Sequence, residues 1–226
     1  MVILTRLSVA LPAMFAVFFV LGASPATADD AADCAQVQDM DRAIRACTQR
    51  IQALKSLQSG VITGLIAGGV FGNEAIARAY NNRGNAYSRK NNYRAALSDY
   101  NQAISLSMHE ALYYFNRGTA YGNLSDFVRA QSDFDQALTI RPQFPEALSS
   151  RALALINTGN PHRALQDAEL ALRIAPPSAL SLYVRGRALG AIGRVEEAVV
   201  DLRKSLALDP TLSDSSEALR RLGFTP

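Results

Sequence analysis

Apolar and small residues recur along this chain with a period of 34 residues. Four successive units carry the same residue classes at matching positions, and no insertion or deletion breaks the spacing. The clearest series are Gly84, Gly118, Ala152 and Gly186; Tyr87, Tyr121, Leu155 and Leu189; Ala96, Ala130, Ala164 and Ala198; Tyr100, Phe134, Ala168 and Leu202; Met108, Pro142, Pro176 and Pro210. A period of this length indicates stacked supersecondary units, each of which buries its apolar face against the next.

Within each unit the pattern predicts two antiparallel helices. In the second unit, apolar or small residues recur at helical spacing over 111–123 and again over 127–140. Ser125 and Asp126 are expected to form the turn and the N-cap between these helices. Pro142 is expected to stop the second helix, because proline lacks an amide hydrogen and disfavours helix just before itself.

These motifs resemble those of the tetratricopeptide repeat (TPR) family. The stretch Tyr-x-x-Arg-Gly-x-x-Tyr at 114–121, followed by Ala130, Phe134, Ala137 and Pro142, matches the family pattern at nearly every marker except its usual leucine. The resemblance implies an all-α fold, an α-solenoid of antiparallel helix pairs stacked into a right-handed superhelix with a C-terminal capping helix. It says much less about function, because one fold serves many functions.

The expected organisation follows the repeats. The segments are a signal peptide at 1–28, a degenerate half-repeat with a disulfide at 29–57, a Gly-rich apolar insert at 58–76, TPR units at 77–110, 111–144, 145–178 and 179–212, and a capping helix at 213–226.

The N-terminal segment has the features of a secretory signal peptide. Arg6 supplies a positive start, Leu7 to Leu21 is an apolar run, and a small-x-small cleavage pattern ends at Ala28. The alternative is a retained membrane anchor, which the short run and Pro12 disfavour. We therefore expect an exported protein, periplasmic or secreted.

The two cysteines, Cys34 and Cys47, are expected to form a disulfide, since an exported protein meets an oxidising environment. Two free thiols are the alternative. Aligning the upstream sequence with the repeats places Cys47 at the position of Tyr100 and Cys34 at that of Tyr87. A bridge between them would tie together the two helices of a truncated first repeat and cap the open end of the stack.

Four glycines recur every four residues in the insert, at Gly60, Gly64, Gly68 and Gly72. This small-x-x-x-small spacing suits close helix contacts. A buried or flexible insert is the favoured interpretation, with a homo-oligomer contact or a membrane contact as alternatives. The apolar run is too short to span a bilayer.

Each unit also carries one arginine and one aspartate at fixed positions. The two series are Arg83, Arg117, Arg151 and Arg185, and Asp99, Asp133, Asp167 and Asp201. A ladder of structural ion pairs is the favoured interpretation, because every arginine has a matching aspartate. The alternative is an arginine row that lines a groove for acidic ligands.

Composition gives no sign of catalysis or of nucleic-acid binding. The net charge is only +3, and the basic residues are spread along the chain instead of clustered. No phosphate-binding loop, nucleophile elbow or zinc-protease motif occurs. The only histidines, His109 and His162, are far apart and are expected to be surface residues. We expect no enzyme activity, cofactor or metal site.

The concave wall of the solenoid is the expected binding surface for a protein or peptide partner. The candidates are the first-helix residues not needed for packing: Arg78, Asn81, Asn85, Arg89, Leu112, Phe115, Thr119, Asn123, Glu146, Ser149, Leu153, Asn157, Leu180, Tyr183 and Arg187. Asparagines could bond an extended backbone, while Phe115 and Tyr183 could take side-chain anchors.

A subset of TPR proteins grips C-terminal carboxylates with a two-carboxylate clamp of three cations and two asparagines. Here only Asn85 and Asn116 match that clamp, and Asn81, Glu146 and Ser150 stand where its cations would be. The resemblance therefore does not imply carboxylate-clamp binding.

These observations predict a non-enzymatic docking protein of the cell envelope that binds a peptide or protein partner in its concave groove. One alternative is a self-assembling structural protein that uses the Gly-rich segment or the solenoid ends. A second is an accessory subunit of an envelope enzyme.

Overall fold

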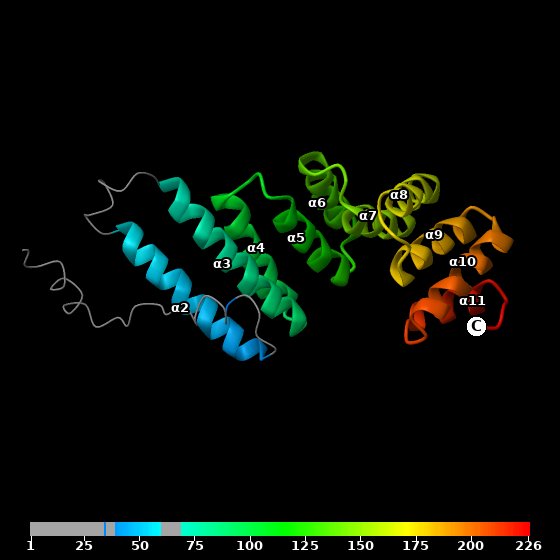
Figure 1. Ribbon diagram of the computed structural model, residues 1–226, viewed down its shortest axis with the longest axis horizontal. Helices are drawn as coiled ribbons and strands as arrows, with labels where there is room; N and C mark the ends of the chain where they lie inside the picture. The colour runs from blue at the N-terminus through cyan, green and yellow to red at the C-terminus, as the bar shows by residue number, and fades with distance from the viewer. Residues whose placement is uncertain (1–33, 35–38, 60–68) are drawn as a thin grey trace, which may run out of the picture.

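The computed structural model describes Cys34, 39–59 and 69–226, and over these residues the chain forms ten helices and no strands. The helices are stacked in chain order along one axis, with α2 towards one end and α11 at the other (Figure 1). They are α2 (Met40–Ser59), α3 (Gly69–Arg89), α4 (Tyr93–Leu106), α5 (Ala111–Asn123), α6 (Phe127–Ile140), α7 (Pro145–Asn157), α8 (Pro161–Ile174), α9 (Ala179–Ala191), α10 (Val195–Leu208) and α11 (Ser213–Arg221). The predicted α-solenoid of helix pairs is confirmed.

The bounds of α5 and α6 are those that the hydrophobic pattern predicts for the second unit. The signal peptide predicted at 1–28 and the glycines Gly60, Gly64 and Gly68 lie outside the described residues, so these expectations remain predictions. None of the helices in the described part of the chain combines the length and the hydropathy needed to cross a membrane.

The first helix of the first full unit begins earlier than the repeat pattern suggests. Helix α3 starts at Gly69 and runs without a break across the predicted boundary between 76 and 77. Ile76 and Tyr80 are buried in a cluster with Cys47 and Ile51 of α2. The last residues of the predicted insert are therefore helical, and packing against α2 explains why the helix extends beyond one repeat length.

A small residue on the first helix of each unit faces a position on the second helix that holds a larger residue in three of the four units. The matching positions are Gly84 and Tyr100, Gly118 and Phe134, Ala152 and Ala168, Gly186 and Leu202. A Cβ atom on Gly84 would lie 2.7 Å from the ring of Tyr100, too close for any side chain. In the third unit both positions are alanine and both are buried. The size of one residue therefore sets the size allowed at the other.

Each turn between the paired helices contains one residue with positive φ. These residues are Asn91, Ser125, Gly159 and Gly193, with φ of 58°, 60°, 80° and 85°. In the second unit Asp126 follows and accepts a hydrogen bond from the amide of Arg129, as expected for an N-cap. The turn conformation is thus repeated although its residue changes, because asparagine, serine and glycine can all occupy this region.

The two ends of the stack are closed differently. At the N-terminal end a disulfide joins Cys34 to Cys47, as predicted, and both residues are buried. At the C-terminal end, α11 packs on α10 and α9. The hydroxyl of Ser205 on α10 lies 2.7 Å from the carbonyl of Ala179, to which it donates, and 2.8 Å from the hydroxyl of Ser215 on α11. The preceding units have buried alanines at the position of Ser205, so this serine is specific to the capped end.

The first helices of the units form the inner side of the stack. Each helix packs on its chain neighbours, and α3 also packs on α5, α5 on α7, α7 on α9, and α9 on α11. Within the described helices, no such packing joins the second helices α4, α6, α8 and α10 to one another. The first helices therefore lie closer together and line the concave face.

Candidate partner-binding groove

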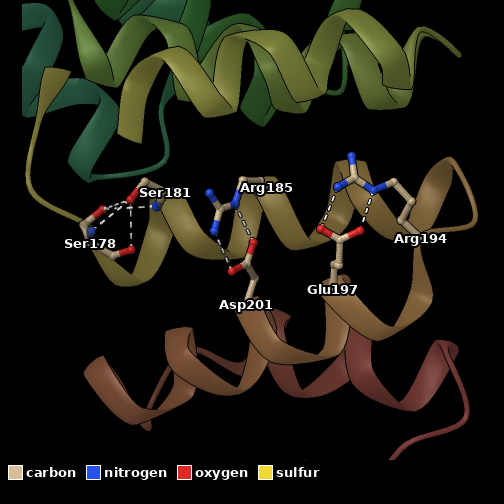
Figure 2. A network of polar contacts seen from close by, with 6 residues as sticks. All are labelled: Ser178, Ser181, Arg185, Arg194, Glu197 and Asp201. Carbon is tan, nitrogen blue, oxygen red and sulfur yellow. Dashed lines mark hydrogen bonds and ion pairs between the residues drawn. The ribbon is translucent and has the colours of Figure 1, made fainter. Parts of the chain in front are cut away.

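The arginine and aspartate series form the predicted ladder of ion pairs. In every unit the arginine on the first helix donates through two nitrogens to both carboxylate oxygens of the aspartate on the second, at 2.6–2.8 Å. Figure 2 shows the last of these pairs, with Arg185 on α9 facing Asp201 on α10. These hydrogen bonds raise the pKa of all four guanidinium groups above its ordinary value. The four arginines are therefore paired within their own units, as the favoured interpretation of the sequence predicts.

Three of these arginines also reach the preceding unit with their remaining nitrogen. Arg83 donates to Thr48 at 2.9 Å, Arg117 to Asn101 at 2.8 Å, and Arg151 to Asp135 at 2.7 Å. Each guanidinium therefore links three helices: the helix that carries it, the second helix of its own unit, and the second helix of the preceding unit. This arrangement fixes the register between units as well as within them.

A groove of about 280 Å³ opens on the concave face towards the C-terminal half of the stack. Its walls come from α5, α6, α7, α9 and α11. Seven of the residues that the sequence predicts for partner binding line it: Thr119, Asn123, Leu153, Asn157, Leu180, Tyr183 and Arg187. The fold thus brings together residues of three different repeats in one concave site.

The groove combines apolar surface with amide groups. Leu153 is partly buried, and Leu180 is 45% exposed. Asn123 and Asn157 occupy equivalent positions in successive units, and each donates to a backbone carbonyl four residues earlier in its own helix. Those bonds orient the two side chains and leave amide oxygens that can accept backbone N–H groups from an extended segment.

One cation and one anion also line the groove. Arg187 on α9 donates through Nη1 to the hydroxyl of Tyr183 at 2.9 Å, and its guanidinium carbon lies 5.8 Å from the centre of that ring. Asp214 comes from the first turn of the capping helix α11. The two charges do not form an ion pair with each other or with any other residue of the described chain. Both side chains can therefore form ion pairs with charged groups of a ligand.

Comparison with known proteins identifies the architecture. Three models described as tetratricopeptide repeat match residues 77–107, 115–179 and 179–212, which together span more than half of the chain. The chain belongs to the tetratricopeptide repeat family. No curated protein matches its sequence.

Several solved TPR structures share this fold. MamA 41-end from Desulfovibrio magneticus RS-1 has a TM-score of 0.57 and 24% identity over 65% of this chain and 83% of that one. YrrB, described as a TPR protein with an unusual peptide-binding site, has a TM-score of 0.56 and 20% identity over 81% and 98%. The first TPR of Spaghetti (RPAP3), bound to the HSP90 peptide SRMEEVD, has a TM-score of 0.50 and 23% identity over 51% and 92%. Identities this low show a common fold only.

Three predicted binding residues of this TPR chain are used for packing instead. Asn81 is 3% exposed and accepts a hydrogen bond from Asn116 at 2.8 Å, and Ser149 is 4% exposed. Phe115 packs its ring against Phe134 and Phe144, with ring centres 6.0 and 4.9 Å away. Asn81 and Ser149 are therefore not open to a partner, and Phe115 is no free anchor.

The remaining predicted residues lie outside the groove. Arg78, Arg89, Leu112 and Glu146 are exposed on the first helices. Asn85 accepts a hydrogen bond from the hydroxyl of Tyr100 at 2.8 Å, which ties it to its own unit. Asn85 and Arg89 also border a small separate hollow near Cys34. Among the described residues, no contact brings this set to the groove of the later units.

The sequence pattern missed part of the groove wall. Ser150 and Ala154 belong to α7, Phe127 and Phe134 to α6, and Asp214 to the capping helix. The residues of α6 are at repeat positions that indicate core, and nothing in the repeat places the capping helix beside the groove. These groove residues are identified only in the folded stack.

In the part of the chain that the structure describes, no group of three or more histidine, cysteine, aspartate or glutamate residues is arranged to hold a metal ion. His109 and His162 are both exposed. The groove chemistry is that of a binding surface, with apolar contacts, amide hydrogen bonds and a cation that has no carboxylate partner among the described residues.

Proposed function

We propose that this TPR protein binds an extended segment of a protein partner in the groove formed by α5, α6, α7, α9 and α11, and that it catalyses no reaction. The observation that carries the proposal is the convergence of Leu153, Leu180, Asn123 and Asn157 on one concave surface. Amide groups at successive repeat positions suit the regularly spaced N–H and C=O groups of an extended chain, and the leucines suit its side chains.

The structural neighbours support the class of ligand without naming it. YrrB is described as having a peptide-binding site, and the TPR of Spaghetti was solved with a bound peptide. The groove charges of this chain, Arg187 and Asp214, have no ion-pair partner within its described part, so the same mode of binding is open to it.

We further propose that the protein works in the cell envelope. The apolar segment from Leu7 to Leu21 suits export, and the Cys34–Cys47 disulfide suits an oxidising compartment. Expression of the full chain with an alkaline-phosphatase fusion, which is active only outside the cytoplasm, tests this location. We expect phosphatase activity that is lost when the apolar run 7–21 is deleted, and an inactive fusion of the full chain would contradict the proposal.

Selection of a displayed library of short random peptides on the purified full chain tests the binding site. We expect the selected peptides to lose binding to Leu180→Asp, because a charge would then replace an apolar wall of the groove. Leu112→Asp is the matched control, since Leu112 holds the same repeat position on α5, is 39% exposed and does not line the groove. Peptides that bind Leu180→Asp as well as the unmodified chain would exclude the groove as the binding site.

A further inference from the structure

We infer that the segment held in the groove carries an acidic side chain, aspartate or glutamate, that pairs with Arg187. This inference rests on the proposed function and adds the charge of the ligand to it. It is carried by three features of Arg187: its place outside the repeat scaffold, its fixed orientation, and its position within the length of the groove.

Arg187 is not part of the arginine ladder. Two residues earlier, Arg185 makes a bidentate ion pair with Asp201, whereas Arg187 has no carboxylate partner among the described residues. Its repeat position is uncharged in the other units, which have Asn85, Thr119 and Leu153 there. Three units therefore fold without a cation at this position, so a structural role in the repeat does not explain the presence of Arg187.

The guanidinium is held ready for an incoming carboxylate. Tyr183 is only 5% exposed, so its position is set by packing, and its hydroxyl accepts a hydrogen bond from Arg187 Nη1. Within the described chain the other donors of the guanidinium have no hydrogen-bond partner, and their planar geometry matches the two oxygens of a carboxylate. Leu153 and Leu180 line the same groove, and apolar surroundings strengthen an ion pair once the ligand excludes water.

The location of Arg187 favours an internal side chain over a C-terminal carboxylate. Helices α5 and α7 line the groove on one side of α9, and Asp214 of α11 lines it on the other. A segment that fills the groove therefore passes Arg187 and continues. The carboxylate-clamp positions of the family, held here by Asn81, Glu146 and Ser150, contribute no cation for a chain terminus.

Asp214 opposes the binding of an anion but has a separate structural reason to be there. It lies in the first turn of α11, where a carboxylate interacts favourably with the helix dipole. It therefore supplies a control of opposite sign: Asp214→Asn is expected to tighten the binding of an acidic peptide, while Arg187→Gln weakens it.

The experiment uses a library of random peptides inserted within a displayed protein, so that the random residues are internal. Binding peptides are selected separately on three full-length chains: unmodified, Arg187→Glu and Leu180→Asp. We expect peptides from the unmodified chain to be enriched in Asp or Glu beside an apolar residue. Those from Arg187→Glu should instead be enriched in Lys or Arg. For one selected acidic peptide, Arg187→Gln should weaken binding about tenfold, and replacing the acidic residue by its amide should remove that difference.

The outcomes separate the two proposals. Peptides that depend on Leu180 but show no acidic preference, or bind equally to Arg187→Glu, would overturn this inference and leave the proposed function standing. Selection of peptides only when the library is displayed at a free C-terminus, and not when it is internal, would overturn the internal acidic side chain. The absence of any Leu180-dependent peptide would overturn both the inference and the proposed function. Unchanged melting temperatures for the Arg187 variants would show that the effect concerns binding and not folding.

Discussion

Arg83 on α3 donates a hydrogen bond of 2.9 Å to the hydroxyl of Thr48 on α2. Thr48 holds the position that Asn101 holds in the first full unit, when Cys47 is aligned with Tyr100, and Arg117 donates to Asn101 in the same way. The contact is the one expected if α2 is the second helix of a preceding, degenerate unit. Helix α2 thus packs on α3 and makes the same type of hydrogen bond that α4 makes with α5.

The partly buried ion pairs of the ladder should contribute much more to the free energy of unfolding than the exposed ion pairs do. Asp133→Ala removes the partner of Arg117, in a pair whose side chains are only 6% and 21% exposed, and leaves an unpaired, partly buried cation. We expect urea unfolding to report a loss of about 2–3 kcal/mol in the free energy of unfolding. Glu197→Ala is the control, because it breaks an exposed pair with Arg194 and should change little (Figure 2). Equal effects for the two variants would contradict the structural role of the ladder.

Loss of the Cys34–Cys47 disulfide should destabilise mainly the N-terminal end of the stack. Serine at both positions should remove about 3 kcal/mol of stability in the entropic model of cross-links. Because repeats contact only their neighbours, faster hydrogen exchange is expected in α2 and α3, while α9 to α11 keep their protection. Exchange that rose equally along the whole chain would show that the disulfide stabilises more than the N-terminal cap.

Two glycines of α5 should respond to alanine in opposite directions. A Cβ on Gly118 would lie 2.8 Å from the ring of Phe134, so Gly118→Ala should destabilise the protein by about 1–3 kcal/mol. A Cβ on Gly122 would meet nothing within 4 Å, and Gly122→Ala should stabilise the helix by up to about 1 kcal/mol. Thermal melts of both variants measure the difference. Destabilisation by Gly122→Ala would argue against the open space beside it.

Ser205 on α10 and Ser215 on the capping helix should contribute to stability as a coupled pair. Since Ser205 donates to the carbonyl of Ala179, Ser215 is the donor in the bond between the two hydroxyls, which are fully buried. Ser205→Ala should cost about 1–2 kcal/mol, because it leaves both Ser215 and the carbonyl without this partner. The double variant with Ser215→Ala should cost less than the sum of the single changes in a double-mutant cycle. Strict additivity would mean that the hydroxyls do not interact.

Buried tyrosines predict a loss of stability at alkaline pH. Burial, aided by the carboxylate of Glu110, raises the pKa of Tyr113 from 10.0 to about 12. Above pH 10 the unfolded chain loses this proton while the folded chain keeps it, so stability falls as the pH rises from 10 to about 12. Melting temperatures measured across this range should fall less steeply for Tyr113→Phe. An unchanged slope in that variant would show that Tyr113 does not contribute.

Much of the architecture follows from the residues that repeat. The bounds of α5 and α6, the Arg117–Asp133 type of ion pair and the disulfide all depend on contacts within one unit or between sequence neighbours. Such contacts are set by helical spacing, by turn residues and by matching side-chain sizes, and these are visible in a single sequence.

The groove is different, because its shape accumulates over several units. Asn81 and Ser149 are buried and lie outside the groove, while Tyr183 at the same repeat position lines it; Asn85 holds the repeat position of Leu153 and Arg187 but does not line it. Repeat position alone does not separate these cases, since the tilt between units depends on the particular side chains at each junction. Likewise, Asp214 reaches the groove only because α11 packs back on α9.

The amino-acid sequence by itself thus determined the TPR stack, its ion-pair ladder and its disulfide, because local periodicity and short-range pairing specify them. The tertiary structure decided which concave residues remain open, that α3 extends to Gly69, and that Arg187 is the cation of the groove without a carboxylate partner in the described chain. These features depend on packing between units and on the capping helix, and such contacts join residues that no single repeat relates to one another.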